Sequence, residues 1–111
     1  VWSSWCGSCR QEHPTMVKVG KGGQQIVPII GLDYKDKDAD AMRFLRQGGD
    51  PYDFSIKDPT GEVGINFGVY GVPETFVIDK KGVIRYKQIG PITPEAWDKK
   101  IHPLINQLKA E

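Results

Sequence analysis

The stretch from Trp2 to Pro14 reads WSSWCGSCRQEHP and contains both cysteines of the 111-residue chain, Cys6 and Cys9. Gly7 and Ser8 separate them, which gives a C-x-x-C pair. A disulfide across so short a spacing closes almost no loop in the unfolded chain, so it would add little stability. The spacing therefore favours a dithiol that is oxidised and reduced in function over a structural bridge.

Metal or haem binding is the alternative for such a pair. A structural zinc site uses four protein ligands, and only His13 and His102 are available besides the cysteines. A c-type haem site needs histidine directly after the second cysteine, where Arg10 stands. Copper(I) held by Cys6, Cys9 and His13 stays open because thiolates bind it well. An inert pair also stays open, but we expect no metal.

Charge and composition exclude several classes of function. Fifteen Lys and Arg residues against fourteen Asp and Glu give a net charge of +1, and 39% of the residues are hydrophobic. No Lys/Arg run is interleaved with aromatics, as a surface that follows nucleic-acid phosphates would require. The longest apolar run, residues 26–32, is far shorter than the roughly 20 residues that span a bilayer. We expect one domain over residues 1–111 and no nucleic-acid partner.

Hydrophobic periodicity predicts alternating helices and strands. Val1 and Trp2 end a strand, and glycines or turn-forming residues separate the later segments. Alternation followed by a hairpin predicts an α/β fold, a mixed sheet covered by helices on both faces. The predicted elements are a helix from near Cys6 to about Val19, a strand over 25–33, a helix from Asp38 as N-cap to Gly48, a strand over 53–56, a turn over 58–61, a short helix over 64–67, an antiparallel hairpin of 75–78 and 83–88, and a helix over 94–109.

Three prolines mark irregular positions in this prediction. Pro14 and Pro103 lie inside predicted helices, where the missing N–H predicts a kink. Pro28 lies inside the strand predicted over 25–33 and argues partly against it.

The segment Trp5 to Cys9, WCGSC at the start of a predicted helix, resembles the redox motif of the thioredoxin superfamily. The chain is similar in nearly its whole length to the DsbE/CcmG family of thiol:disulfide interchange proteins of cytochrome c maturation. The stretches that carry this resemblance are 2–14, 31–36 (GLDYKD), 66–79 (NFGVYGVPETFVID) and 81–86 (KGVIRY). The resemblance implies a thioredoxin-like mixed sheet flanked by helices.

Two departures from the family pattern stand out. Family members carry an N-terminal membrane anchor and further strands ahead of the motif, and these are not among the 111 residues. Ser8 stands where Pro or Thr is common in the family. We therefore expect an N-terminally truncated domain that is less stable than a chain extended upstream of Val1.

The resemblance implies a dithiol reductant of apocytochrome c, or of its haem-ligation partners, that receives electrons from a membrane thiol donor. It implies a periplasmic protein tethered to the inner membrane by the anchor, with the cysteine pair in place of a cofactor. Uncharged Gly7 and Ser8 agree with a reducing potential, near the thioredoxin value of about −270 mV. A general periplasmic disulfide oxidase and a Cu(I) carrier of the same fold are the alternatives.

The position of the cysteines on the helix predicts their roles. Cys6 at the helix start faces unpaired N–H groups and the positive end of the helix dipole, which favour the thiolate. We therefore expect Cys6 to be the nucleophile and the more shielded Cys9 to resolve the mixed disulfide. Ser8 either donates a weak hydrogen bond to sulfur or has a capping role.

By resemblance, Val72 and Pro73 form a cis-proline loop against the cysteines, where the backbone of Val72 pairs with a substrate peptide. An ordinary trans turn is the alternative. Trp5 is expected to shield the sulfurs and line the substrate groove. Trp2 is expected in the core.

Two glutamates are weighed as modulators of the dithiol. Glu74 near the sulfurs would raise the pKa of Cys6 or transfer protons, whereas the alternative is a solvated surface residue. Glu12 is a second modulator or a simple salt-bridge partner. His13 and His102 are expected to be structural or on the surface.

Overall fold

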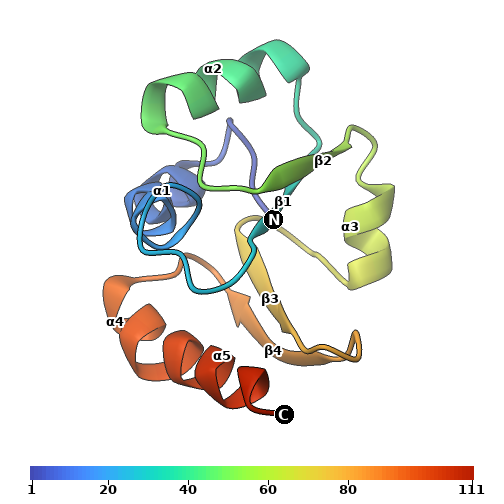
Figure 1. Ribbon diagram of the computed structural model, residues 1–111. Coiled ribbons are helices and arrows are strands. Elements are labelled where there is room, and N and C mark those ends of the chain that lie inside the picture. The colour runs from blue at the N-terminus through green and yellow to red at the C-terminus, as the bar shows by residue number, and fades with distance from the viewer.

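The computed structural model describes residues 1–111, with the strands lying between helices (Figure 1). Figure 1 has α2 above the strands and the C-terminal helical segment below them. The helices are α1 (Gly7–Val19), α2 (Asp38–Gly48), α3 (Glu62–Phe67), α4 (Pro94–Ala96), a π-helical turn (Trp97–Ile101) and α5 (His102–Lys109). The strands are β1 (Ile30–Tyr34), β2 (Phe54–Asp58), β3 (Glu74–Ile78) and β4 (Ile84–Ile89).

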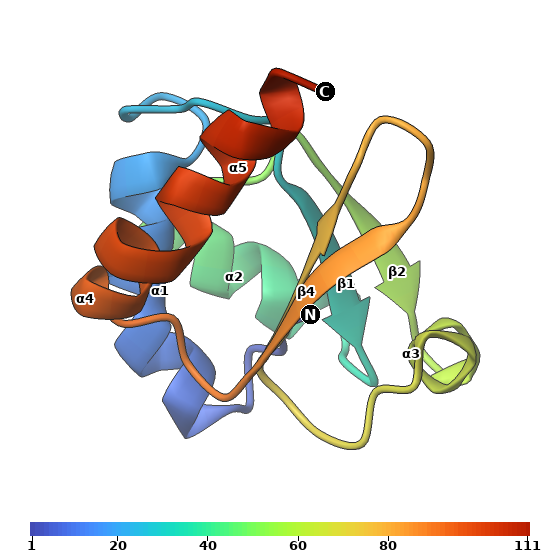
Figure 2. The ribbon, with the colours of Figure 1, turned by 90° about the horizontal axis from the view of Figure 1, so that it is seen from below.

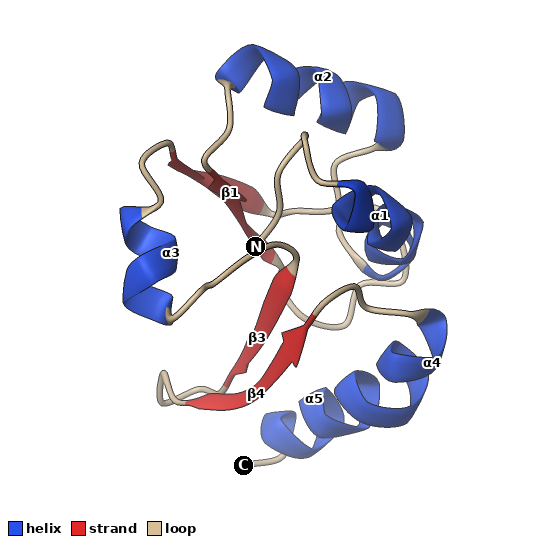
Figure 3. Ribbon diagram, turned by 180° about the vertical axis from the view of Figure 1, so that it is seen from behind, coloured by secondary structure: helices blue, strands red, loops and turns tan.

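The strands form two pairs, β1 with β2 in parallel and β3 with β4 antiparallel. The first two residues of the chain lie between these pairs, as Figure 3 shows. The N–H of Trp2 donates to the carbonyl of Leu32 at 2.9 Å, and its carbonyl accepts from the N–H of Tyr34 at 2.8 Å. The ammonium group of Val1 donates to the carbonyl of Glu74 at 2.6 Å. The predicted strand end at residues 1–2 is therefore confirmed, and it joins the two pairs.

Two clusters of buried side chains make the core. Figure 2 shows α1 beside the C-terminal helical segment, with α3 at the opposite edge of the molecule. The first cluster joins α1, β3 and the C-terminal segment, and contains Met16, Val19, Val77, Ile92, Trp97, Ile101, Ile105 and Leu108. The second joins the start of α1 to α2, and contains Trp2, Cys6, Cys9, Ala41, Phe44 and Tyr52. Both cysteines thus belong to the core, on a framework set by aromatic side chains.

Trp2 is at the centre of the second cluster, with only 2% of its surface exposed. Its ring stacks on Phe44 and Tyr52 at centroid distances of 5.6 and 5.5 Å. The prediction that Trp2 is a core residue is confirmed. Burial of this ring fixes the strand end immediately before the cysteines.

Beyond Val1, the space between β1 and β3 widens into a partly open apolar cavity of about 650 Å³. Strand, α3 and α5 side chains line it, among them Ile30, Leu32, Phe67, Val77, Ile105 and Leu108. The two strand pairs are therefore joined closely only at the end next to α1.

Several boundaries differ from the prediction for local reasons. The first full strand begins at Ile30 rather than residue 25, and the N–H of Ile29 donates to the side chain of Asp53 instead of to a strand. Pro28, just before it, has no N–H for a ladder. Lys37 occupies the N-cap of α2, so the prediction of Asp38 as N-cap is wrong by one residue.

The last helix forms as predicted but changes its geometry ahead of Pro103. The N–H of His102 donates to the carbonyl of Trp97, five residues back, in the π-helical turn. Pro103 has no N–H group to donate, and the wider π-helical turn accommodates this missing donor. The irregularity predicted at Pro103 is therefore a π-helical turn just ahead of it. Helix α1 continues through Pro14 without interruption. No helix combines the length and hydropathy required to cross a bilayer.

Candidate active site

Cys6 and Cys9 form a disulfide at the start of α1. Cys6 is the N-cap residue, with extended backbone, and its Sγ accepts a hydrogen bond from the N–H of Cys9 at 3.1 Å. The sulfur therefore takes the place that a capping oxygen usually fills. Because a backbone donor at a helix N-terminus stabilises negative charge, the same position favours the Cys6 thiolate after reduction.

The disulfide is covered from the core side and approachable from the other. Both cysteines are buried, Cys6 at 6% and Cys9 at 2% exposure, whereas Gly7 and Ser8 between them are exposed. A side chain added at Gly7 would meet no atom within 4 Å. Trp5 is 57% exposed next to Cys6. These exposures leave the Trp5 to Ser8 surface open to solvent and Cys6 slightly more accessible than Cys9.

Residues 3–5, which lead into Cys6, are tied to the end of β1 and the loop after it. Ser3, Ser4 and Trp5 each donate at least one hydrogen bond to residues 34–36, so all three positions of the segment are fixed. The bonds run from Ser3 Oγ to the carbonyl of Tyr34, from Ser4 N to Asp36 Oδ2 at 2.8 Å, from Ser4 Oγ to Asp36 Oδ1 at 2.7 Å, and from Trp5 Nε1 to the carbonyl of Lys35 at 2.9 Å. We call residues 3–5 with these partners the Ser3–Trp5 clamp.

Asp33 is buried on β1, where its backbone forms a parallel β-bridge with Trp2. Burial, followed by the hydrogen bond and negative charge of Asp36, raises the pKa of Asp33 to about 8. Both aspartates belong to the GLDYKD stretch that resembles the DsbE/CcmG family, but no local pattern in it marks them as site residues. The available signal was an aspartate inside a predicted buried strand, where a charged side chain needs an explanation.

The Val72–Pro73 loop packs against the core cluster to which the disulfide belongs. The peptide bond between these residues is cis, as predicted, and Pro73 is buried. Val72 is half-buried and packs against the core cluster that contains both cysteines. The structure therefore brings together the two segments, residues 5–9 and 72–73, that the sequence singled out.

Glu74 is buried, so the alternative of a solvated surface residue is wrong. Its Oε2 accepts from the N–H groups of Tyr70 and Gly71 at 2.9 and 3.2 Å, and its Oε1 pairs with Lys87 Nζ at 2.9 Å. Burial alone would raise the pKa of Glu74, but the hydrogen bonds from Lys87, Tyr70 and Gly71 outweigh it and lower the pKa. The ionised carboxylate shapes the loop that leads to Pro73.

Glu12 is also buried, one turn beyond Cys9, and forms no salt bridge with a Lys or Arg side chain. Its Oε1 accepts from the N–H of Ile92 at 2.9 Å. Burial raises its pKa, against the opposing effects of that hydrogen bond and the Val1 ammonium group. The salt-bridge interpretation is therefore wrong, and Glu12 ties α1 to the segment ahead of the C-terminal helices.

Both histidines have structural contacts, as predicted. His13 is buried, its Nε2 is hydrogen bonded to the carbonyl of Gly49 at 2.8 Å, and its ring contacts Phe44. His102 is half-buried against Trp97. The bond to Gly49 engages one of the two ring nitrogens of His13.

The disulfide thus lies at the N-terminus of α1, in a core cluster against which Val72 also packs. The sulfur chemistry that such surroundings support is exchange with another disulfide. The fold and the site together define a protein of thioredoxin-like architecture with an exchangeable C-x-x-C disulfide.

Comparison with known proteins identifies the branch of this class. The Redoxin family matches residues 1–102. Thiol:disulfide interchange protein DsbE of Allochromatium vinosum is 44% identical over 105 residues, which cover 95% of this chain and 57% of that protein. DsbE of Pasteurella multocida is 46% identical over 108 residues, which cover 97% of this chain and 58% of the relative. The chain belongs to the Redoxin family and, within it, to the DsbE type of thiol:disulfide interchange protein.

A solved structure agrees with the sequence comparison. A crystal structure from Chlorobium tepidum, described as that of a thiol:disulfide interchange protein DsbE, superposes with a TM-score of 0.69 at 32% identity. The alignment covers 98% of this chain and 74% of the other. The chain spans little more than half the length of the curated relatives above, at 57% and 58%.

Proposed function

We propose that this protein is a dithiol reductant that acts on oxidised cysteines of apocytochrome c, or of the proteins that prepare it for haem attachment. The observation that carries the proposal is the Cys6–Cys9 disulfide at the N-cap of α1. The two residues between these cysteines, Gly7 and Ser8, are exposed and uncharged. Without a cationic residue between the cysteines, the thiolate is not held strongly enough to make the disulfide a powerful oxidant.

The proposed reaction is a two-step exchange that needs no cofactor. The Cys6 thiolate attacks one sulfur of the substrate disulfide, forming a mixed disulfide and releasing the other substrate sulfur as a thiolate. Cys9 then loses its proton and attacks Cys6 Sγ, which re-forms the intramolecular disulfide and releases the second substrate thiolate. Two electrons pass from the protein to the substrate, and the released thiolates take up protons.

The remaining site residues support binding rather than chemistry in this proposal. Trp5 offers an exposed ring beside Cys6, and Val72 offers its backbone next to the disulfide, where an extended peptide would pair. Glu74 keeps the 70–73 loop in shape, and Glu12 lies on α1 behind the cysteines. A membrane thiol donor would then reduce the pair again, with the protein working in the periplasm and tethered to the inner membrane.

The reduction potential of the Cys6/Cys9 pair tests the proposal. We expect a value nearer about −270 mV than the roughly −120 mV of a strong periplasmic oxidant. A peptide with an oxidised C-x-x-C-H haem-attachment motif should be reduced stoichiometrically, and faster than a peptide with the same cysteines and no histidine. A potential above about −160 mV would favour the general disulfide oxidase and overturn the reductant.

Variants of the two cysteines test their proposed roles. Cys9→Ser should accumulate mixed disulfides with the peptide through Cys6, because the resolving thiol is missing. Cys6→Ser should trap little peptide, since the buried Cys9 is a poor attacking group. Trapping mainly through Cys9 would reverse the roles, and one Cu(I) bound per chain in protein purified without chelators would favour the copper carrier.

A further inference from the structure

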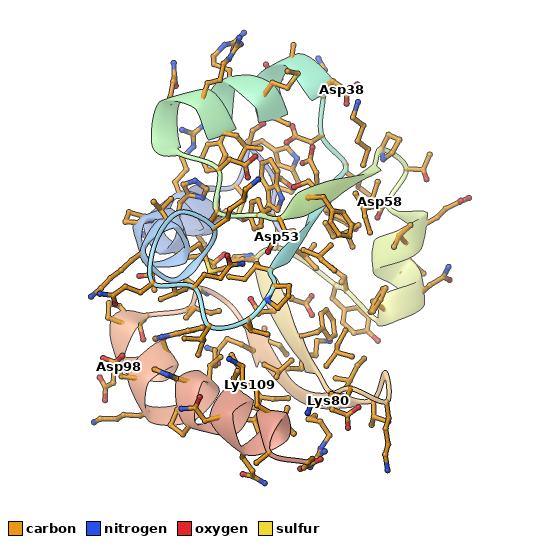
Figure 4. All side chains as sticks on the ribbon, viewed as in Figure 1. Asp38, Asp53, Asp58, Lys80, Asp98 and Lys109 are labelled. Carbon is orange, nitrogen blue, oxygen red and sulfur yellow. A yellow bond between two sulfur atoms is a disulfide. The ribbon has the colours of Figure 1, made fainter.

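A polar pocket of about 210 Å³ opens beside the residue that precedes Cys6. It lies between the Ser3–Trp5 clamp, the first turn of α1 and one side of α2, whose start Asp38 marks in Figure 4. No residue of the Val72–Pro73 loop lines this pocket, so it is distinct from the loop that approaches the cysteines from the core cluster. With Ser4, the lining residues are Trp5, Arg10, Asp40, Arg43, Phe44 and Gln47.

Helical spacing places the pocket next to the reacting pair. The α2 residues that line it, at positions 40, 43, 44 and 47, follow the spacing that puts side chains on one side of a helix. Arg10 comes one turn after Cys6 on α1, and its backbone N–H donates to the carbonyl of Cys6 at 3.2 Å. A group bound in the pocket would therefore lie alongside a protein whose disulfide reacts at Cys6.

The guanidinium group of Arg10 is fixed in position, but its charge is not neutralised. Its Nη2 donates to the carbonyl of Ser4 at 2.8 Å, and the group lies over the ring of Phe44 at 5.3 Å from the centroid. Arg10 takes part in no ion pair and makes no further side-chain hydrogen bond. A guanidinium carries five N–H donors in a planar fork that matches a carboxylate, so most of these donors stay available for one.

The rest of the pocket adds a second cation and an aromatic wall. Arg43 is exposed and pairs with Asp40 at only 3.4 Å, so the pocket holds two guanidinium groups against one carboxylate. The exposed ring of Trp5 is held by its hydrogen bond to the carbonyl of Lys35 at 2.9 Å. This excess of positive charge beside a fixed ring suits a carboxylate on a short apolar stem.

We propose that the pocket binds an acidic side chain, glutamate or aspartate, of the protein that exchanges its disulfide with Cys6. The carboxylate pairs with Arg10, and its stem lies against Trp5, which orients the partner while the sulfurs react. The pocket serves the exchange at Cys6 and Cys9 whichever protein carries the substrate disulfide.

The first experiment measures how fast the reduced wild-type protein reduces peptides that contain one intramolecular disulfide. Each peptide carries one glutamate at one of the positions that flank the cysteines, and its counterpart carries glutamine there. At the position that reaches the pocket, the glutamate peptide should be reduced about two- to fivefold faster, the effect of an exposed ion pair. Equal rates at every position would overturn the proposal. Reduction of the glutamine peptides measures the exchange itself, so a missing preference counts against the pocket alone.

Variants then locate the preference, which is read as the ratio of the glutamate and glutamine rates. Arg10→Met keeps an unbranched stem over Phe44 but removes the charge, so the ratio should fall to about one. Arg46→Gln is the matched control, because Arg46 is exposed on α2 and does not line the pocket. The control should keep the wild-type ratio. If Arg10→Met also keeps it, or if both variants lose it, the pocket does not bind the partner.

A charge swap keeps the test independent of any loss of folding. Arg10→Glu should reduce a lysine peptide faster than the glutamine peptide when lysine occupies the preferred position. A misfolded variant cannot acquire a preference that the wild-type protein lacks. If Arg10→Glu still prefers the glutamate peptide, the assignment of Arg10 is wrong.

Acetate distinguishes a partner side chain from a free carboxylate. Acetate should lower the glutamate preference of the wild-type protein more than chloride does at the same ionic strength, because only a carboxylate accepts both bonds of the guanidinium fork. Equal effects of the two salts would mean general screening and contradict the pocket. If acetate moves the NMR signals of the Arg10 side chain but no peptide shows a glutamate preference, the pocket takes free carboxylates only, and the proposal is overturned.

Discussion

The space between β1 and β3 has two ends that differ in almost every respect. At the end next to α1, Val1 and Trp2 fill it and bond to both strand pairs. We call this the site end. At the other, which we call the open end, the apolar cavity of about 650 Å³ separates the same strands.

The difference shows that packing is complete at the end of this space next to the dithiol and incomplete at the other end. Local hydrogen bonds and the stacked ring of Trp2 hold the site end, so the segment before Cys6 is fixed by short-range contacts. The open end contributes little packing, because atoms that line a cavity have no partners on one side. Changes that remove packing at the site end should therefore destabilise the domain, whereas changes that fill the open end should stabilise it.

The largest effect is expected from Trp2→Ala at the site end. Removing a buried tryptophan that packs on Phe44 and Tyr52 should lower the free energy of unfolding by about 3–5 kcal/mol. Urea denaturation measures this. Trp5→Ala is the control, because exposed Trp5 loses chiefly one hydrogen bond to Lys35, about 1 kcal/mol. Equal losses would mean that the packing of the Trp2 ring on Phe44 and Tyr52 contributes little to stability.

An apolar extension ahead of Val1 should stabilise the protein by filling the open end. A few residues rich in Val, Ile and Leu would continue the strand between β1 and β3, and burying one such side chain contributes about 2 kcal/mol. Thermal unfolding measures the gain. An extension of the same length made of Gly and Ser is the control, and an identical melting temperature for both would show that the cavity does not accept a strand.

Lys87→Met should have a smaller effect, confined to the loop that approaches the disulfide. It leaves the buried carboxylate of Glu74 without its cation, at a cost of about 1–3 kcal/mol, since Lys87 is partly exposed. Because the folded protein lowers the pKa of Glu74 below 4.5, its stabilisation is present above that pH and is lost as the pH falls.

The acid side of the stability curve should therefore be less steep in the Lys87→Met variant. Combining Lys87→Met with Glu74→Gln should recover part of the loss, because the buried charge is then gone. If the double variant is less stable by the sum of the two single changes, the pair does not act as a unit.

A further effect concerns the ammonium group of Val1. Burial lowers its pKa from 8.0 to about 6, although Glu12 and Glu74 oppose the shift. Between these pH values the unfolded chain binds more protons, so stability should rise as the pH increases from about 6 to 8. The Gly/Ser-extended chain, whose amine lies elsewhere, isolates this contribution. Parallel pH curves for the two chains would contradict it.

The sequence predicts the elements around the dithiol well. The C-x-x-C pair, the helix to Val19 and the hairpin after Pro73 all follow from local patterns and are confirmed. The strand over 25–33 is only partly correct. Apolar β-branched residues predict strand, but they cannot reveal that Ile29 bonds to the side chain of Asp53.

Buried carboxyl groups are what the sequence predicts least well. The fates of Glu12 and Glu74 depend on Ile92 and Lys87, partners that are distant in the sequence. Asp33 is similar, because the burial that raises its pKa depends on packing between segments distant in the sequence. These contacts form through packing between segments that are distant in the sequence, and no local sequence pattern predicts them.

The open surroundings of Gly7 have a consequence for how this site can change in evolution. A side chain there would meet no neighbouring atom within 4 Å, and Gly7 is not among the residues with positive φ. Replacement therefore carries no steric penalty and leaves the helix start intact. Since the residues between the cysteines tune the redox equilibrium, single substitutions at this position can shift the protein between electron donor and acceptor while the fold stays the same.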